Sequence, residues 1–290
     1  MKKIFAITVH RMTNPLIFLV DYISSFENNL IFIHIDKKSD ETIFFENLAR
    51  DNVIFLENRV DVRWGGVGQI RATLNLMMAA LKNEFDYLFF LSGDDIPLKT
   101  NKEFDYFLEK NNGKNFFQFD ENGSNHIDRL KFNYPDFFLR KNKSFFEKLI
   151  LFFFPIVRGV FFKNKIFHQK GKKILYYKGD SWFGIDFISA NKIIEFLNSN
   201  PWYLDMYEKS YCGDEIFFHT IAKNLELNFF EESSRNNALR YIDWSSGPDY
   251  PRILDEEDVA EMKKSDMFFA RKIDPNADLD FMIQFVRERS

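Results

Sequence analysis

The fold is decided by the opening stretch KIFAITVHRMTNPLIFLVDYISSFENNLIFIHID (residues 3–36). It contains two runs rich in β-branched and aromatic residues, KIFAITVH (3–10) and LIFIHID (30–36), which are typical of buried strands. The segment between them has helical length and begins near Asn14 and Pro15, where proline suits the first helical turn. This order predicts a strand, a helix and a second strand parallel to the first.

The same alternation continues to about residue 120. Strands are predicted at NVIFLE (52–57), YLFFLS (87–92) and NFFQFD (115–120), and helices at GVGQIRATLNLMMAALKN (66–83) and NKEFDYFLEKN (101–111). We therefore predict an α/β fold with a central, mainly parallel sheet that is covered by helices on both faces.

After residue 121 the alternation stops. It resumes with a strand at SWFGID (181–186), helices at ISANKIIEFLNS (188–199) and DEIFFHTIAKNL (214–225), and an acidic, then amphipathic closing segment from about 249 to 290. The sequence contains no internal repeat and no low-complexity linker. We expect a single domain over residues 1–290, with residues 121–178 as an insertion.

Charge is divided unevenly along the chain. The formal net charge of the 290 residues is −4, but residues 129–178 hold thirteen Lys and Arg against two Asp and Glu, a local sum of +11. The other residues sum to −15. This balance does not suggest a nucleic-acid partner, whereas the basic block (129–178) predicts an anionic one.

The longest apolar stretch, LILFFFPIVRGVFF (149–162), lies inside the basic block. It is shorter than the ~20 apolar residues that cross a bilayer, and it contains Pro155 and Arg158. Two interpretations remain open. The stretch is either a helix in the interface of an anionic membrane or a partly buried helix of the insertion.

The single cysteine, Cys212, excludes an intramolecular disulfide and argues against a zinc site with cysteine ligands. A reducing compartment fits this composition. The apolar run from Ile4 to Val9 is too short for a secretory signal. We therefore expect a cytoplasmic protein, located at the inner face of the cytoplasmic membrane if the basic block binds lipid.

Polar residues follow several of the predicted strands, and ligands of open parallel sheets bind at such carboxyl ends. The sequence lacks GxGxxG and GxxxxGK[ST], so dinucleotide and P-loop sites are disfavoured. Asp36 could hold a ribose or a base, or it could be a turn residue. Asp94 and Asp95 could hold Mg²⁺ or Mn²⁺ against a diphosphate, or form a turn.

Glu215 lies just before an apolar helical run, and we expect Asp214 to be the N-cap of that helix. A carboxylate in the first helical turn is stabilised as an anion by exposed backbone N–H groups, which suits a general base. The alternative is the ordinary preference of glutamate for a first turn.

Six segments occur in an order that resembles glycosyltransferase family 14. They are VDVRWGGVGQIRATLNLMMAAL (60–81), YLFFLSGDDIPLKT (87–100), KGDSWFGID (178–186), YCGDEIFFHTI (211–221), LRYIDWSSGPD (239–249) and FFARKID (268–274). That family contains core-2/I-branching β-1,6-N-acetylglucosaminyltransferases and peptide O-xylosyltransferases. The resemblance spans nearly the whole chain outside the basic block. Because the disulfide cysteines of the animal enzymes are missing, the chain resembles a bacterial-type member.

The resemblance implies a GT-A-type nucleotide-sugar fold and inverting transfer from a UDP-sugar, with no obligatory metal or other cofactor. Asp36 matches the position that binds uridine, and Thr8 lies where the first strand also touches it. Glu215 matches the catalytic base. Arg240 and Lys272 match the two basic residues that take the place of a metal at the diphosphate.

Asp95 matches a position of the family pattern, but the acid beside it, Asp94, departs from that pattern. Metal binding by this pair therefore stays open as the weaker alternative. Asp95 and Asp214 are also candidates for polar contacts to the donor or acceptor sugar.

Several further residues have two interpretations each. Trp64, Trp182 and Trp244 are candidates for stacking on a sugar, or they are core residues. Cys212 could be a thiol nucleophile, although a small buried residue is favoured. His219 could tune Glu215 from one turn further along the helix, although a packed histidine is favoured.

We expect transfer of N-acetylglucosamine, or alternatively xylose, from its UDP donor to the hydroxyl of a saccharide or lipid-linked saccharide during surface-glycan assembly. The basic block lies where acceptor contacts belong in the family, so we expect it to face the acceptor or an anionic membrane. Two rival hypotheses are a non-catalytic module that binds anionic glycan or lipid, and a metal-dependent hydrolase of nucleotide sugars.

Overall fold

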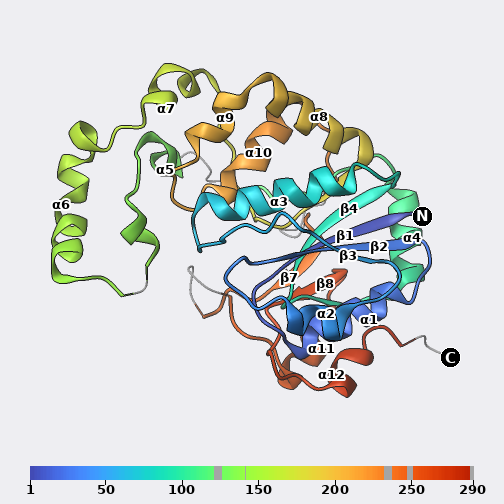
Figure 1. Ribbon diagram of the computed structural model, residues 1–290. Helices are drawn as coiled ribbons and strands as arrows, with labels where there is room; N and C mark the ends of the chain where they lie inside the picture. The colour runs from blue at the N-terminus through green and yellow to red at the C-terminus, as the bar shows by residue number, and fades with distance from the viewer. Residues whose placement is uncertain (121–125, 141, 232–236, 247–250, 288–290) are drawn as a thin grey trace.

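The computed structural model describes residues 1–290 except 121–125, 141, 232–236, 247–250 and 288–290. Its centre is a five-stranded sheet with the order β3-β2-β1-β4-β6 (Figure 1). The strands are β1 (Lys3–Val9), β2 (Asn29–Ile35), β3 (Val53–Phe55), β4 (Tyr87–Ser92) and β6 (Gly184–Asp186). The first four run parallel, and β6 pairs antiparallel with β4. The predicted mainly parallel sheet is confirmed.

Helices cover both faces of this sheet because its strands are apolar on both sides. Alternate residues of β1 enter different cores, with Ile4 and Ala6 on one face and Phe5 and Ile7 on the other. The first face is covered by α3 (Val67–Ala80), α8 (Phe187–Ser199), α9 (Pro201–Met206) and α10 (Asp214–Asn224), and the second by α1 (Asn14–Ser24), α2 (Thr42–Leu48) and α4 (Asn101–Lys110). The predicted α/β architecture is therefore present.

A second, three-stranded sheet brings the end of the chain to the turn after β4. Its order is β5-β8-β7, with β5 (Ile96–Pro97), β8 (Phe269–Arg271) and β7 (Arg240–Ile242). A third core cluster, with residues of α11 (Val259–Lys264) and α12 (Leu279–Ile283), packs below it. As a result, Arg240 at the start of β7 lies beside Asp95, and Lys272, directly after β8, lies beside Asp94.

The strand predicted at residues 115–120 is wrong as a regular element. Asn115, Phe116 and Phe119 form isolated bridges to Phe229, Gly184 and Gly179 respectively. Phe229 lies in one segment and runs parallel to this stretch, whereas Gly184 and Gly179 lie in another, pair antiparallel and do so in two different registers, so no continuous ladder forms. The buried phenylalanines of this stretch instead join the two cores on either side of the sheet.

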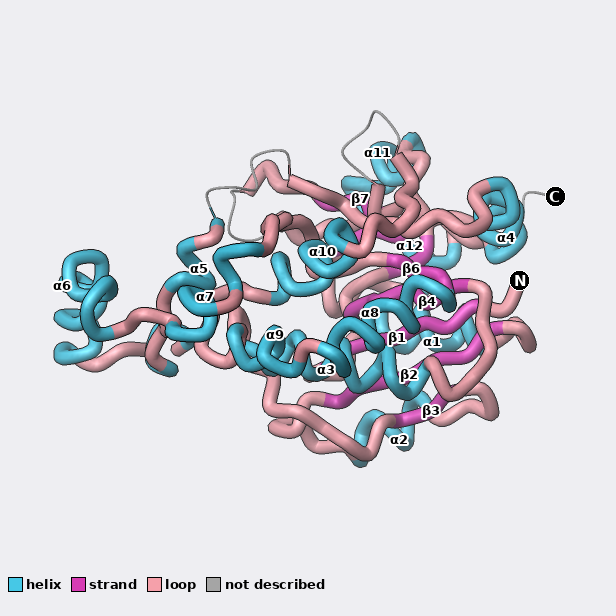
Figure 2. The backbone as a smooth tube through the Cα atoms, turned by 90° about the horizontal axis from the view of Figure 1, so that it is seen from above, coloured by secondary structure: helices cyan, strands magenta, loops and turns pink. Residues whose placement is uncertain are grey.

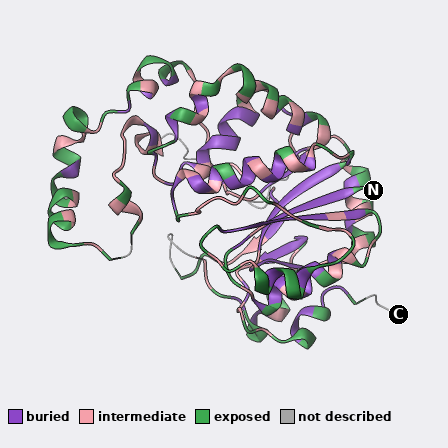
Figure 3. Cartoon of the chain, in the orientation of Figure 1, coloured by how far each residue is buried: buried purple, intermediate pink, exposed green. Residues whose placement is uncertain are grey.

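The basic block extends away from the sheet as an arm (Figures 1 and 2). Its helices are α5 (Asp128–Lys131), α6 (Phe145–Phe161) and α7 (Lys165–Gln169), with short 3₁₀ turns at Asp136–Leu139 and Gly171–Lys173. Residues 121–125 and 141 of the expected insertion lie outside the described residues. Much of the arm is exposed (Figure 3). None of the helices in the described part of the chain has the length and apolarity needed to cross a membrane.

Candidate active site

A cavity of about 460 Å³ lies between the start of α10, the segment before β6 and the ends of β7 and β8. Six residues predicted from the sequence as site residues line it, namely Trp64, Trp182, Asp214, Glu215, Trp244 and Lys272. Five others lie outside the lining, namely Thr8, Asp36, Asp94, Asp95 and Arg240. The structure therefore brings together the expected base, one expected cation and all three candidate tryptophans.

Glu215 is held by two cations from the basic block. Its Oε2 accepts a hydrogen bond from Arg129 Nη1 at 2.6 Å and lies 3.4 Å from Lys178 Nζ. The Glu215 side chain is 31% exposed, so the carboxylate faces the cavity while it keeps both partners. Neither cation was proposed as a site residue from the sequence, because their contact with Glu215 arises only from the fold.

Asp214 is not the N-cap of α10, as the sequence had predicted. Gly213 occupies that position, and the helix begins at Asp214 itself. The Asp214 carboxylate instead accepts a hydrogen bond from Ser181 Oγ at 2.6 Å. Burial raises the pKa of Asp214 to about 6, and the neighbouring charge of Glu215 acts in the same direction.

Gly179 connects the basic block to the cavity wall. Its N–H donates to the carbonyl oxygen of Glu215 at 2.9 Å. A Cβ at this position would lie 1.8 Å from the Gln118 carbonyl oxygen and 2.5 Å from His219 Nε2, so only glycine fits. The residue before it, Lys178, contacts Glu215, and the residue after it is Asp180. Burial raises the pKa of Asp180, which lines the cavity.

Asp94 and Asp95 are each paired with a basic residue. Lys272 Nζ and Arg11 Nη2 both lie 3.3 Å from the Asp94 carboxylate. Arg240 Nε donates to Asp95 Oδ1 at 2.8 Å, and its side chain is nearly fully buried. Lys272 thus reaches the cavity wall, whereas Arg240 is held behind it. Asp94 and Asp95 are the acids that could bind a metal, and Lys272 and Arg240 are the cations that could replace it. In the structure each acid is paired with one of these cations.

These pairs bear on whether the acids fit a metal ion. Asp95 also accepts a hydrogen bond from the backbone N–H of Ser92 at 2.7 Å, so its carboxylate is well supplied with donors. A divalent cation between Asp94 and Asp95 would have to compete with Lys272 and Arg240. Within the described ranges, no group of three or more His, Cys, Asp or Glu side chains is placed to hold a metal.

The tryptophans at the cavity are not ordinary core residues. Trp64 and Trp244 are 55% and 47% exposed, so the core interpretation is wrong for them. Trp182 is half-buried and contacts the core, but its ring also lines the cavity. The guanidinium carbon of Arg271 lies 4.7 Å from the centroid of that ring, which places a further cation in the wall.

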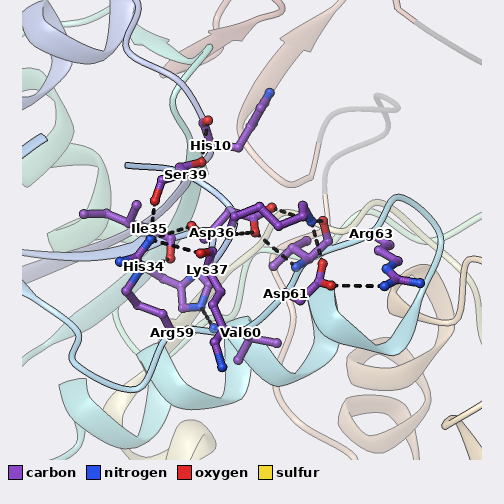
Figure 4. A network of polar contacts seen from close by, with 12 residues as sticks. His10, His34, Ile35, Asp36, Lys37, Ser39, Arg59, Val60, Asp61 and Arg63 are labelled. Atoms are coloured by element: carbon purple, nitrogen blue, oxygen red, sulfur yellow. Dashed lines mark hydrogen bonds and ion pairs between the residues drawn. The ribbon is translucent and has the colours of Figure 1, made fainter. Parts of the chain in front are cut away.

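Asp36 directly follows β2, in a network of polar contacts (Figure 4). Its carboxylate accepts from the backbone N–H of Lys38 at 3.0 Å and is 3.0 Å from Lys38 Nζ. Lys38 also bonds to Asp61 at 2.6 Å, and Asp61 lies 3.3 Å from Arg63, which lines the cavity. Thr8 lies opposite His34 of β2 in the sheet.

Two residues near Glu215 have structural roles, as favoured from the sequence. Burial raises the pKa of the Cys212 thiol to about 12, so the thiol remains protonated at neutral pH. The His219 ring is fully buried against Phe117 and Phe119, and burial lowers its pKa to about 3. A neutral, enclosed imidazole fits core packing better than proton exchange with Glu215.

Comparison with known proteins agrees with this architecture. The family model described as "Branch: Core-2/I-Branching enzyme" matches residues 4–267. The chain belongs to the Core-2/I-Branching enzyme family. This is glycosyltransferase family 14, and the mainly parallel α/β sheet is its GT-A-type fold.

Curated relatives of this family match over part of their length. The chain is 36% identical over 245 residues to "Xylosyltransferase 2" of Canis lupus familiaris, which covers 76% of this chain and 24% of the relative. The Homo sapiens protein of the same name matches with the same figures. A "Beta-1,3-galactosyl-O-glycosyl-glycoprotein beta-1,6-N-acetylglucosaminyltransferase 3" of Rattus norvegicus is 31% identical over 114 residues, 37% of this chain and 26% of the relative. The chain thus spans about a quarter of the length of these relatives.

Four charged residues that line the cavity or contact Glu215 were not among the candidates from the sequence, namely Arg129, Lys178, Asp180 and Arg271. Arg129 and Lys178 were counted in the basic block, and Arg271 directly precedes Lys272 in the FFARKID segment. Lys178 and Asp180 also lie within the KGDSWFGID segment, whereas Arg129 lies in none of the six segments. The contacts that bring these four residues to the cavity or to Glu215 were not visible in the sequence.

Proposed function

We propose that this chain transfers a sugar from a UDP-sugar to a saccharide hydroxyl, with inversion at the anomeric carbon, in the assembly of surface glycans. The observation that carries the proposal is that Glu215 and Lys272 line one cavity, together with three aromatic side chains. Such a transfer needs three kinds of group: a carboxylate that accepts a proton, a cation that stabilises the departing phosphate, and aromatic rings that stack on the sugars.

Glu215 is the proposed general base. It accepts the proton of the acceptor hydroxyl while the acceptor oxygen bonds to the anomeric carbon. The bond from that carbon to the phosphate oxygen breaks, and UDP leaves with the electron pair. Since attack and departure occur on opposite faces, one carboxylate suffices. Arg129 and Lys178 orient this carboxylate through their contacts with Oε2.

Lys272 and Arg240 are proposed to stabilise the charge that develops on the diphosphate, in the role that a metal has in other enzymes. Lys272 is 35% exposed and can turn from Asp94 to an arriving anion. Arg240 lies behind the cavity wall, held by its ion pair with Asp95, and is proposed to stabilise the diphosphate charge from that position. Arg271, which lines the same cavity, is a third candidate for this contact. Asp36 and Thr8 are proposed to bind the uridine.

Two donors are proposed, UDP-xylose and UDP-N-acetylglucosamine. The match to the xylosyltransferases covers 76% of this chain, whereas the match to the N-acetylglucosaminyltransferase covers 37%. The longer match favours xylose. The Asp95, Asp214 and tryptophan side chains are the candidates for contacts to the donor and acceptor sugars.

A panel of UDP-sugars tests the function. We expect UDP-xylose or UDP-N-acetylglucosamine to bind more tightly than UDP-glucose, and to release UDP slowly without acceptor and faster with a saccharide acceptor. NMR of the product should show an anomeric configuration opposite to that of the donor. Failure to bind any UDP-sugar would refute the proposal, and rapid release of free sugar that no acceptor accelerates would favour a hydrolase.

A further inference from the structure

The outer surface of α6 is almost entirely apolar. Six of its large side chains, Phe145, Phe146, Phe152, Ile156, Val160 and Phe161, are each between 73% and 77% exposed. We call these six residues the apolar face of α6. Among the exposed residues of this helix, Lys148 is the one that carries a charge. Such a surface is unusual on a soluble domain and marks a contact with an apolar partner.

The contacts on the other side of α6 fix which way this face points. Phe154 is buried, with its ring centroid 5.2 Å from that of Tyr134 and 4.6 Å from that of Phe138. Arg158 Nη2 lies 2.9 Å from Asp128 Oδ2 of α5. The helix is therefore attached to the arm along one stripe, and its apolar face is turned away from the rest of the arm.

In the part of the chain that the structure describes, several lysines close to α6 in the sequence lack acidic partners. Lys148, Lys163, Lys165, Lys172 and Lys173 form no ion pair with any side chain in the described part of the chain, and four of the five follow α6 closely in sequence. The basic block as a whole sums to +11. An exposed apolar helix face and unpaired lysines on the same arm together provide the two attractions that hold a helix in the interface of an anionic bilayer.

We propose that the apolar face of α6 inserts into the interface of an anionic lipid bilayer, and that the unpaired lysines of the arm bind the lipid phosphates. Charge complementarity selects this partner. A second copy packed face to face would bring two blocks of +11 against each other. A bilayer also accepts phenylalanines that point in several directions, because lipid needs no matching shape.

The attachment of α6 connects the bilayer to the cavity. Asp128, the partner of Arg158, directly precedes Arg129, which binds Glu215. A short helix, α5, thus joins the membrane-bound arm to the proposed base. If the proposed transferase function holds, this arrangement suits a saccharide acceptor carried on a lipid. The lipid-binding proposal itself does not depend on that function, since vesicle binding is measured without substrate.

Co-sedimentation with vesicles tests the proposal. The unmodified protein should bind vesicles of phosphatidylglycerol and phosphatidylcholine at least about tenfold more tightly than vesicles of phosphatidylcholine alone. The triple variant F152S/I156S/V160S should lose at least about tenfold in affinity for the anionic vesicles. Ile188→Ser on α8, where the side chain is 67% exposed, is the matched control and should bind as the unmodified protein does.

A charge variant separates the two attractions. K163Q/K165Q/K172Q/K173Q should lose most of the preference for phosphatidylglycerol. Circular dichroism verifies that each variant is folded. Equal binding to neutral and anionic vesicles, or unchanged binding by the triple variant, would overturn the proposal. So would a dimer in light scattering that the triple variant abolishes while no vesicle binding is seen, because the face would then bind a second copy.

Discussion

Arg129 Nη1 lies 2.6 Å from Oε2 of Glu215, although the two residues are 86 positions apart in the chain. The contact joins the basic block to the first turn of α10. It also bears on which partner the positive charge of the basic block binds. Some of the positive charge of the block is directed at the carboxylate of the cavity, and not only at external partners.

Replacement of Glu215 by Gln tests its role as general base. The amide keeps the size of the side chain but cannot accept the proton, so we expect turnover to fall about 10²- to 10⁴-fold. Because Glu215 is not proposed to contact UDP, the UDP affinity should stay within about twofold. Stopped assays give the turnover and calorimetry gives the affinity. Near-normal turnover would remove Glu215 from this role.

Arg129 is predicted to be a positioning residue. Arg129→Met keeps much of the side-chain stem but removes both the charge and the donor to Glu215, so kcat should fall about tenfold or more with little change in the KM for the donor. Arg129→Lys should recover part of kcat. Arg140→Met is the matched control, since Arg140 pairs with Glu147 on the arm. Equal loss in Arg129→Met and Arg140→Met would indicate a general effect on the arm.

Removal of metal ions is predicted to have little effect on activity. Asp94 is paired with Lys272, and Asp95 with Arg240, so the cations already supply the charge that a metal would bring. With EDTA present, turnover should stay within about twofold of the untreated enzyme. If EDTA abolished activity and Mn²⁺ restored it, the Asp94–Asp95 metal hypothesis would be the correct one.

His219 is predicted to make the fold sensitive to acid. Its pKa is lowered from 6.5 to about 3 in the folded chain, so its contribution to stability is present above pH 6.5 and is lost as the pH falls toward 3. Between pH 6.5 and 5 this loss is about 2 kcal/mol in the free energy of unfolding. His219→Leu should lose less over that range in denaturant titrations. Parallel pH profiles of the two proteins would contradict the assignment.

The strands and helices of the sheet could be predicted because their signal is local. The apolar runs at 3–9 and 87–92 are buried on both sides and therefore continuous in sequence. The stretch at 115–120 has a similar composition, but its partners come from two segments of opposite direction and the pairing shifts register, which no local pattern records. Gly213 is the N-cap of α10, and Asp214 accepts a hydrogen bond from Ser181, a residue that is distant in sequence.

The candidate site could be predicted only where a motif contains the residue. Glu215 and Lys272 occur within recognisable segments, and both line the cavity. The arrangement of Arg240 behind the wall depends on its ion pair with Asp95, 145 positions away. The role of Lys178 depends likewise on how the chain folds back to α10. Tertiary structure determines such pairings. From the sequence alone, only the excess of basic residues in the block can be seen.

The tight approach at Gly179 has a practical consequence for redesign. The loop that carries Lys178 and Asp180 is a natural target for libraries aimed at new acceptors, because both residues border the cavity region. Any library that randomises Gly179 would consist largely of unfolded or distorted members, since even alanine meets the Gln118 carbonyl oxygen. A library should therefore vary the positions on either side and keep Gly179 unchanged.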